Sequence, residues 1–373
     1  MKHKFVLSND LAIDCRLRNS TGIGRYISEL VPRAVAALPE RRIVLLGPRQ
    51  DDPWFRERIA PIRGDVATIA SDARVFRMAE QRLYRAVARQ ARVFWCTHFN
   101  VPWTWPRNQR LVVNVHDLIP VHVAVGWKGR IRWLGAKWYL AAVRRRADRI
   151  LVLSQAVADE LVQEQRFERS RLRPIHLGVA PEWFTADRTT CPRLGQEPFV
   201  LYLGNISPHK NVGALLQAFA EVTQEVPQRL VIVGERRGFT EHADFGALVA
   251  HLGSRVVFAQ RLADGELRGL VAAADLLVQP SLEEGFGLPP LEAMAAGTPV
   301  LTSDCAALLE TAARGAHRFA LRDPGDLAAQ LRRLLTDRLL LRSKTEEGRA
   351  WARQFTWERT AEQTVAVLRE VLA

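Results

Sequence analysis

The sequence contains no run of about 18 apolar residues, which is the length that a membrane-spanning helix needs. Its first ten residues, MKHKFVLSND, become polar too early for a signal peptide, so we expect no secretory leader. Cysteine is scarce, and the four cysteines form no C-x-x-C pair; they are Cys15, Cys96, Cys191 and Cys305. These absences argue against membrane-spanning and disulfide-built proteins and predict reduced thiols in a cytoplasmic protein.

Motifs for metal ions and nucleic acids are also missing. No D-x-D triplet, which would hold a divalent cation, occurs in the chain. Nothing resembles a helix-turn-helix, a zinc finger or an RNP motif. We therefore expect no metal, no cofactor and no nucleic-acid partner.

Charge is divided unevenly along the chain, whose formal net charge is +13. Up to Ala180 there are 32 Lys and Arg against 16 Asp and Glu, and after it there are 21 against 24. A basic half attracts anionic partners. Because no nucleic-acid motif is present, an anionic membrane surface or a pyrophosphate-bearing lipid is the partner we expect.

The basic half includes an aromatic stretch, WKGRIRWLGAKWYLAAVRRRADR, at residues 127–149. Trp127, Ile131, Leu134 and Trp138 fall on one stripe of a helix with this sequence. Such a helix can lie in an anionic membrane interface, or it can turn the stripe to the protein core and leave its basic side in solvent. The sequence leaves both interpretations open.

Short apolar runs alternate with amphipathic segments along most of the chain. This alternation predicts parallel βαβ units and an α/β fold with doubly wound sheets. Strands are expected within residues 5–13, 42–47, 92–97, 110–118 and 149–154 of the first half, and within 198–206, 229–235, 255–260, 276–281 and 298–303 of the second. Helices of the first half are expected after Gly24, over residues 79–92 and over residues 155–165. A polar segment, residues 186–198, predicts a linker between a domain at 1–185 and a domain at 198–356, and a final helix is expected over about 357–373.

The most distinctive segment is PSLEEGFGLPPLEAMAAGTPV, residues 280–300. Its two prolines suit the first turn of a helix, where a missing N–H is no loss. Gly285 and Gly287 permit close approach of the backbone to a ligand, and the free N–H groups of a helix start favour a diphosphate.

Two carboxylates frame this segment. Glu284 falls in the loop, and Glu292 is expected in the first turn of the helix, where it can accept hydrogen bonds from paired ribose hydroxyls. The alternative is structural, with Glu292 capping the helix and Glu284 a solvated loop charge.

As a whole, the segment closely resembles the E-x7-E signature of the retaining glycosyltransferases of family 4, which have the GT-B fold. The resemblance implies two Rossmann-like domains that face a cleft, with a C-terminal helix that crosses back to the first domain. It also implies a nucleotide-sugar substrate bound by Gly285, Phe286, Gly287, Leu288 and Glu292, with Glu284 as a catalytic residue.

A second match is LYLGNISPHKN, residues 201–211, where a predicted strand ends in a glycine loop. Lys210 can reach donor phosphates there, and the resemblance makes it catalytic. Members of the family commonly carry an arginine at the position where this chain has Asn205. We assign Asn205 to donor binding. Arg25, His209 or Arg261 are candidates for the missing charge.

Two further matches lie in the first half. STGIGRYISEL, residues 20–30, resembles the family's glycine loop over the donor phosphate, which assigns donor binding to Gly22, Gly24 and Arg25; a plain left-handed turn is the alternative. In VVNVHDLIP, residues 112–120, His116 follows a strand, and the resemblance places it beside the transferred sugar with Asp117 on the acceptor side. A structural histidine at a strand end is the alternative.

The style of these motifs resembles bacterial mannosyltransferases of polysaccharide and lipopolysaccharide assembly. GDP-mannose is therefore the expected donor, and UDP-glucose, a UDP-N-acetylhexosamine and a deoxysugar donor stay open. The expected acceptor is a glycan or a lipid-linked glycan at the inner face of the plasma membrane. A nucleotide-sugar epimerase, a phosphorylase or a non-catalytic nucleotide-binding scaffold are the other functions that the fold permits.

Overall fold

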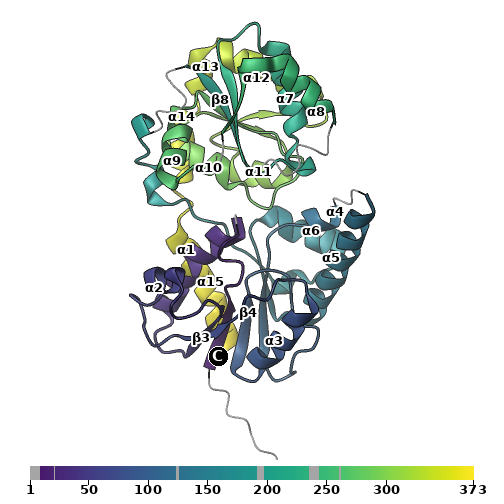
Figure 1. Cartoon of the computed structure of the whole chain (residues 1–373), viewed down its shortest axis with the longest axis vertical. Helices are drawn as coiled ribbons and strands as arrows, with labels where there is room; N and C mark the ends of the chain where they lie inside the picture. Colours follow the sequence, from purple (N-terminus) through teal and green to yellow (C-terminus); the bar gives the residue numbers. More distant parts are fainter. Residues whose placement is uncertain (1–8, 21, 123–125, 191–196, 235–242, 260–261) are drawn as a thin grey trace, which may run out of the picture. The chain divides into compact units, whose positions relative to one another are not determined.

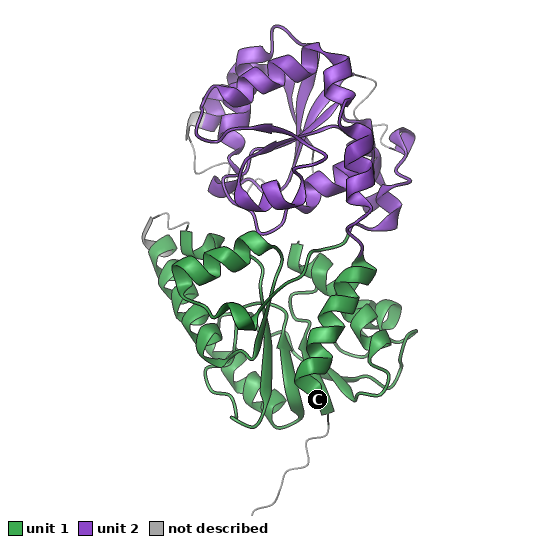
Figure 2. Cartoon of the chain, turned by 180° about the vertical axis from the view of Figure 1, so that it is seen from behind, with its two compact units in different colours: residues 1–178, 357–373 green, residues 179–356 purple. Residues whose placement is uncertain are grey.

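The chain divides into two compact units in a computed structural model that describes residues 9–373 except 21, 123–125, 191–196, 235–242 and 260–261. Unit 1 comprises Met1–Gly178 and Trp357–Ala373, and unit 2 comprises Val179–Thr356 (Figure 2). The boundary falls before the predicted linker, so residues 179–185 belong to unit 2. Part of that linker, residues 191–196, and Cys191 with it, lies outside the described residues.

Unit 1 contains a sheet of seven parallel strands in the order β3-β2-β1-β4-β5-β6-β7. Its central strands are buried on both faces, which explains their nearly continuous apolar sequences. The strands are β1 (Asn9–Asp14), β2 (Ile43–Gly47), β3 (Ala67–Ala70), β4 (Ala91–Cys96), β5 (Arg110–Val115), β6 (Arg149–Val152) and β7 (Leu172–Pro174).

Helices flank this sheet on both faces (Figure 1). They are α1 (Gly22–Ala37), α2 (Pro53–Arg58), α3 (Met78–Ala88), α4 (Ile119–His122), α5 (Gly126–Arg146), α6 (Gln155–Gln165) and α15 (Trp357–Leu372). α15 returns from the end of unit 2 to pack on α1. Its Thr360 hydroxyl donates to the carbonyl of His176 at 2.8 Å, and its Glu358 pairs with Arg33 at 3.0 Å.

Unit 2 contains a sheet of six parallel strands in the order β10-β9-β8-β11-β12-β13. The strands are β8 (Phe199–Leu203), β9 (Arg229–Val233), β10 (Val256–Ala259), β11 (Leu276–Gln279), β12 (Val300–Ser303) and β13 (His317–Phe319). The helices are α7 (Val212–Val222), α8 (Ala243–Leu252), α9 (Asp264–Ala273), α10 (Leu288–Ala295), α11 (Ala306–Thr311), α12 (Asp326–Thr336), α13 (Arg338–Arg342) and α14 (Thr345–Ala352).

The predicted fold class, two doubly wound parallel sheets with a returning C-terminal helix, is confirmed. In each unit the strand order reverses at one place, between β1 and β4 in unit 1 and between β8 and β11 in unit 2. Ligands of open α/β sheets bind at the carboxyl ends of the strands at such a reversal. The side chains that follow these four strands are therefore the ones to inspect.

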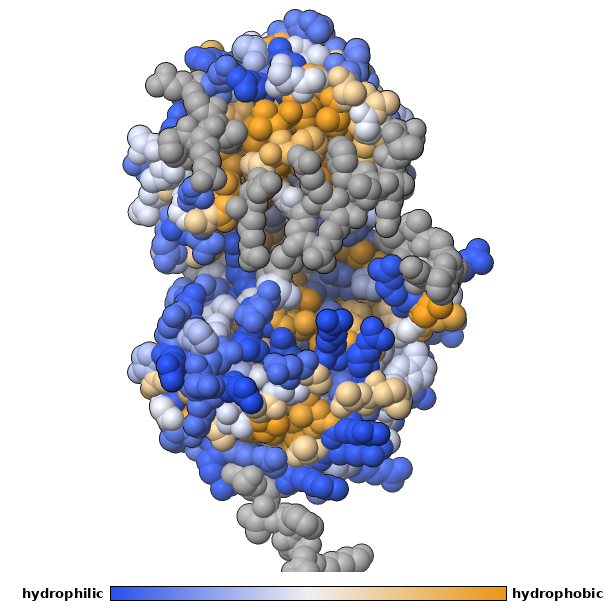
Figure 3. Space-filling model, viewed as in Figure 1, coloured by the Kyte–Doolittle hydropathy of each residue, from blue (hydrophilic) through white to orange (hydrophobic). Residues whose placement is uncertain are grey.

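Helix α5 shows which way its apolar stripe points. Ile131, Leu134 and Trp138 are 59, 60 and 44% exposed, so the interpretation that turned this stripe to the core is wrong. The side chain of Trp127 lies outside the described residues. On the visible face of unit 1, hydrophobic residues lie among many hydrophilic ones (Figure 3). None of the described helices is long and apolar enough to cross a membrane.

Candidate functional site

The loop after β8 approaches the loop after β9 at main-chain distance. Gly204 has φ +151° and donates its N–H to the carbonyl of Val233 at 3.0 Å. A Cβ on Gly234 would lie 1.9 Å from the carbonyl oxygen of Gly204, so no larger residue fits there without moving the backbone. These two glycines fix the start of the segment that carries Lys210.

Lys210 ends a short 3-10 helix, Pro208–Lys210, just before α7. Its Nζ donates to Oε1 of Glu284 at 2.7 Å. The main-chain N–H of Leu282 donates to the carbonyl of His209 at 2.8 Å, which ties the two loops together. The structure thus brings together two of the predicted catalytic residues, at the carboxyl ends of the neighbouring strands β8 and β11.

The carboxylate of Glu284 is held by three donors on one oxygen. Besides Lys210, its Oε1 accepts from Nε2 of Gln279 at 2.9 Å and from Oγ of Ser281 at 2.7 Å. Its Oε2 has no partner among the described residues, and 8% of the side chain is exposed. The side chain is therefore oriented rather than solvated, with one oxygen left to accept a hydrogen bond from a ligand.

The turn between β11 and α10 depends on Gly287. This residue has φ +96°, and a Cβ on it would lie 2.4 Å from Cδ2 of Leu308. The carbonyl of Phe286 accepts from Oγ1 of Thr311 at 2.6 Å, and its ring is buried. Gly285 is buried as well, whereas Leu288 is half-buried.

Glu292 does not lie where the sequence predicted. Because Gly287 takes the left-handed conformation of the N-cap, α10 begins at Leu288 and Glu292 falls in its second turn, with no acidic residue in the first. Only 3% of Glu292 is exposed, and its place in the second turn contradicts the alternative in which it caps the helix start.

The charge expected near Asn205 is not supplied by His209. Burial, with the neighbouring Lys210 charge, lowers the pKa of His209 to about 4, so the ring is neutral at pH 7. Asn205 itself is exposed, and its carbonyl accepts from the hydroxyl of Tyr202 at 2.8 Å. Arg261 lies outside the described residues.

In unit 1, Gly22 and Gly24 lie in the first turn of α1 rather than in a loop. Neither has a positive φ, so the alternative of a left-handed turn is wrong. A Cβ on Gly24 would lie 2.6 Å from the carbonyl oxygen of Arg18, which makes this glycine a point of close packing between the helix and the β1–α1 connection. Gly22 is exposed with open space around it, and Arg25 is half-buried.

His116 follows β5 and is 8% exposed. Its Nε2 lies 2.7 Å from the carbonyl oxygen of Thr97, and its ring meets the ring of Tyr26 edge to face at 5.1 Å. Burial lowers the pKa of His116 to about 4. Asp117 is half-buried, and its carboxylate accepts from the N–H of Ile119 at the start of α4.

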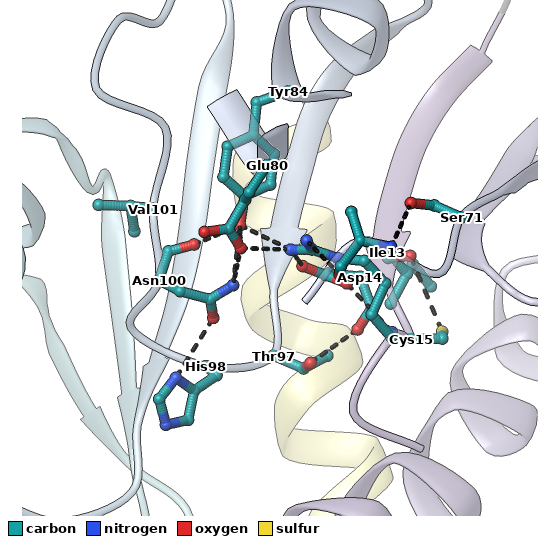
Figure 4. Close-up of polar contacts among 12 residues, drawn as sticks. Ile13, Asp14, Cys15, Ser71, Glu80, Tyr84, Thr97, His98, Asn100 and Val101 are labelled. Carbon is teal, nitrogen blue, oxygen red and sulfur yellow. Dashed lines mark hydrogen bonds and ion pairs between the residues drawn. The ribbon is translucent and has the colours of Figure 1, made fainter. Parts of the chain in front are cut away.

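A buried ionic network that sequence reasoning missed lies at the carboxyl ends of β1 and β4 (Figure 4). Arg16 donates to Asp14 at 2.5 Å, to Glu80 at 2.7 Å and to the hydroxyl of Tyr84 at 2.8 Å. The amide of Asn100 donates to the same Glu80 at 2.5 Å and to the Tyr84 hydroxyl at 2.8 Å. Side-chain exposure is 3% for Arg16, 6% for Asp14 and 0% for Glu80.

Arg16 keeps its charge despite its burial. Burial opposes the charge of Arg16, but Asp14 beside it raises the pKa of Arg16 above its ordinary value. The sequence does contain a signal for this network. The polar segments D-C-R (residues 14–16) and T-H-F-N (residues 97–100) directly follow apolar runs, just as H-D (residues 116–117) follows the apolar run of β5.

Within the described part of the chain, no three His, Cys, Asp or Glu side chains gather as a metal site. Unit 2 instead presents strand-end loops with an oriented carboxylate and one lysine, and unit 1 separately presents a neutral histidine at the end of a strand.

Comparison with known proteins connects these features to a family. Residues 20–183 match the model of Glycosyltransferase Family 4, and residues 186–351 match the model of the glycosyl transferases group 1. The serotype-specific mannosyltransferase WbdA of Escherichia coli is 31% identical over 70% of the chain, which spans only about a third (33%) of that relative. The O-antigen chain mannosyltransferase B of Escherichia coli is 26% identical over 92% of the chain and 95% of its own length.

Solved structures agree on the fold. Sucrose-phosphate synthase of Thermosynechococcus elongatus superimposes with a TM-score of 0.76 at 21% identity, covering 97% of this chain and 98% of its own. HepE of Anabaena, in complex with UDP and glucose, has a TM-score of 0.73 at 16% identity over 97% of this chain and 99% of its own. With the E-x7-E segment and both family models in place, the chain belongs to the family 4 glycosyltransferases of GT-B fold.

Proposed function

We propose that this glycosyltransferase transfers mannose from GDP-mannose to a glycan or lipid-linked glycan in cell-surface polysaccharide synthesis, with retention and without a metal. The observation that carries the proposal is the carboxylate of Glu284, held on one oxygen by Lys210 and open on the other. Mannose is supported by the relatives, since both compared enzymes of Escherichia coli are named mannosyltransferases. A nucleotide-sugar donor is supported by HepE, whose structure contains UDP and glucose. No observation favours the epimerase alternative.

The reaction breaks the bond between the sugar and the diphosphate, so negative charge develops on the leaving group. In unit 2, the Lys210 ammonium and the positive end of the α10 dipole would stabilise that charge, although Pro289 and Pro290 leave few N–H groups in the first turn of this helix. The acceptor oxygen bonds to the anomeric carbon from the face that the diphosphate leaves, and its proton passes to a diphosphate oxygen. No covalent enzyme intermediate is required.

The nucleotide is tested by thermal shift. A ligand that binds only the folded protein stabilises it by about 2.7 kcal/mol at a concentration of 100 Kd. We expect GDP to raise the unfolding temperature more than UDP, ADP or dTDP. In a separate activity assay, we expect Glu284→Ala to reduce mannose transfer by orders of magnitude. A larger shift with UDP would replace mannose by a UDP-linked sugar, and no shift with any nucleotide would contradict the whole proposal.

The acceptor side of the proposal uses the surface of unit 1. The exposed stripe of Ile131, Leu134 and Trp138 on α5 lies among basic residues, and the Trp138 ring meets Trp103 edge to face at 5.1 Å. Trp103 also lines a pocket of about 450 Å³ together with Met78, Ala79, Gln81, Arg82 and Arg85. Apolar side chains beside arginines suit the surface of an anionic membrane, where a lipid-linked acceptor resides. We place the enzyme there, on the cytoplasmic side.

Membrane binding is tested by replacing the stripe. The combined substitution Ile131→Ser, Leu134→Ser and Trp138→Ser should lower binding to phosphatidylglycerol vesicles at least tenfold, because each buried apolar side chain contributes roughly 1.5–3 kcal/mol. Vesicle flotation measures the bound fraction. Leu339→Ser is the matched control, since Leu339 is 87% exposed on unit 2. Equal binding of the triple variant and the control would contradict the assignment of α5.

A further inference from the structure

Two histidines lie side by side at the carboxyl ends of the adjacent strands β4 and β5. The rings of His98 and His116 are 6.0 Å apart between centroids and 27° from parallel. His98 also stacks on Phe99 at 4.3 Å and meets the ring of Phe76 at 5.5 Å. All four residues belong to unit 1. The family resemblance already places His116 beside the transferred sugar, whereas the role of His98 is open.

The hydrogen bond of His116 fixes its tautomer. Its Nε2 lies 2.7 Å from the carbonyl oxygen of Thr97, which can only accept. Nε2 must therefore carry the proton, and Nδ1 is left with a lone pair. No described residue engages that Nδ1.

The tautomer of His98 is fixed in the opposite sense. The amide nitrogen of Asn100 donates to Glu80 and to Tyr84, so its Oδ1 is the atom that faces His98. The distance from that Oδ1 to Nδ1 of His98 is 3.2 Å. Because an amide oxygen only accepts, Nδ1 of His98 carries the proton and Nε2 holds the lone pair. No described residue engages that Nε2.

Both rings are neutral at physiological pH. Burial, with the nearby His116, lowers the pKa of His98 to about 3, and burial lowers the pKa of His116 to about 4. Unit 1 therefore presents two fixed hydrogen-bond acceptors whose rings are 6.0 Å apart. A lone pair of this kind accepts a hydrogen bond from a hydroxyl group. It forms no hydrogen bond with a substituent that lacks a proton to donate.

We infer that His98 reads one hydroxyl of the transferred sugar through Nε2, that His116 reads another through Nδ1, and that Asn100 is the positioning residue that sets the His98 tautomer. With hydrogen bonds of roughly 2.8 Å on each side, the two rings suit two hydroxyls of one pyranose. The inference rests on the proposed function and extends it to sugar selection. Asn100 is 1% exposed and is held by the Arg16 network, so the tautomer of His98 is built into the fold.

The tautomers can be measured without any substrate. Long-range ¹H–¹⁵N correlation on the full-length protein distinguishes a protonated Nδ1 from a protonated Nε2. We expect Nδ1–H for His98 and Nε2–H for His116, and we expect Asn100→Ala to give His98 a mixture of both forms. A wild-type His98 protonated on Nε2 would overturn the inference whatever the donor proves to be.

Sugar reading is tested by His98→Phe, which keeps the ring stacked on Phe99 and removes both nitrogens. We expect kcat/KM with GDP-mannose to fall about 10- to 100-fold, the cost of leaving a bound hydroxyl without its acceptor. Monodeoxy analogues of GDP-mannose identify that hydroxyl. On the analogue that lacks it, the kcat/KM of the wild type should fall by a similar factor. The kcat/KM of the His98→Phe variant should be nearly the same for that analogue as for GDP-mannose. The exposed His122 on the same unit gives the control His122→Phe.

The outcomes separate the inference from the proposed function. Lack of transfer by the wild type from GDP-mannose, UDP-glucose and UDP-N-acetylglucosamine would end the proposed function. If the wild type transfers the sugar and His98→Phe has the same kcat/KM, the inference alone is wrong. It is also wrong if the kcat/KM of the variant falls further by an equal factor on every deoxy analogue. If Phe at position 98 prevents folding, His98→Gln, which retains an acceptor, should keep more activity than His98→Ala.

Discussion

Replacing Lys210 with methionine should lower kcat by about 100- to 1,000-fold, with a smaller change in KM for the donor. The reason is that the ammonium acts on charge that develops as the diphosphate leaves, and removing one such donor costs about that factor. Methionine replaces the unbranched apolar stem of lysine and omits only the ammonium, so the packing of the loop before α7 should be retained. Steady-state kinetics with GDP-mannose and an acceptor glycan measures the effect.

The matched control for this prediction is Lys344→Met on the same unit. The Nζ of Lys344 makes only a long contact of 3.4 Å with the carbonyl oxygen of Arg314. This variant should keep wild-type kinetics, and both variants should keep the far-ultraviolet circular dichroism of the wild type. A Lys210→Met enzyme within threefold of wild-type kcat would show that Lys210 serves only to orient Glu284.

The sequence predicted the sheets well because buried parallel strands are nearly continuous apolar runs. β8 to β12 all lie within their predicted segments. Three edge strands, β3, β7 and β13, were missed because they are short and only partly buried, so their sequences carry little apolar signal. The predicted helix over residues 79–92 ends at Ala88, since Ala91 already begins β4.

The site was predictable where chemistry follows a strand directly. Lys210 and Glu284, 74 residues apart in sequence, come within hydrogen-bond distance because β8 and β11 are neighbours in the sheet. Glu292 was placed one turn too early because the sequence does not reveal that Gly287 is the N-cap. The link from Glu80 to His98 runs through Asn100, and no local pattern in the sequence reports a contact between α3 and the loop after β4.

Replacing Arg16 with methionine destabilises unit 1 by about 3–5 kcal/mol, because it leaves the carboxylates of Asp14 and Glu80 buried without their cation. Eight of the ten tryptophans belong to unit 1, so tryptophan fluorescence during urea unfolding reports mainly on this unit. The urea concentration at the unfolding midpoint should fall, with little change in the slope of the unfolding free energy against urea concentration.

Arg33→Met is the control, since Arg33 pairs with Glu29 and the exposed Glu358 at the surface and its loss costs about 0–1 kcal/mol.

The physical cause is tested by neutralising the whole network. Adding Asp14→Asn and Glu80→Gln to Arg16→Met removes both uncompensated charges, so most of the lost stability should return. A triple variant as unstable as Arg16→Met would mean that packing around the guanidinium, rather than charge, is what Arg16 contributes. Recovery would show that Arg16 stabilises unit 1 mainly by compensating the two buried carboxylates, one of which holds Asn100.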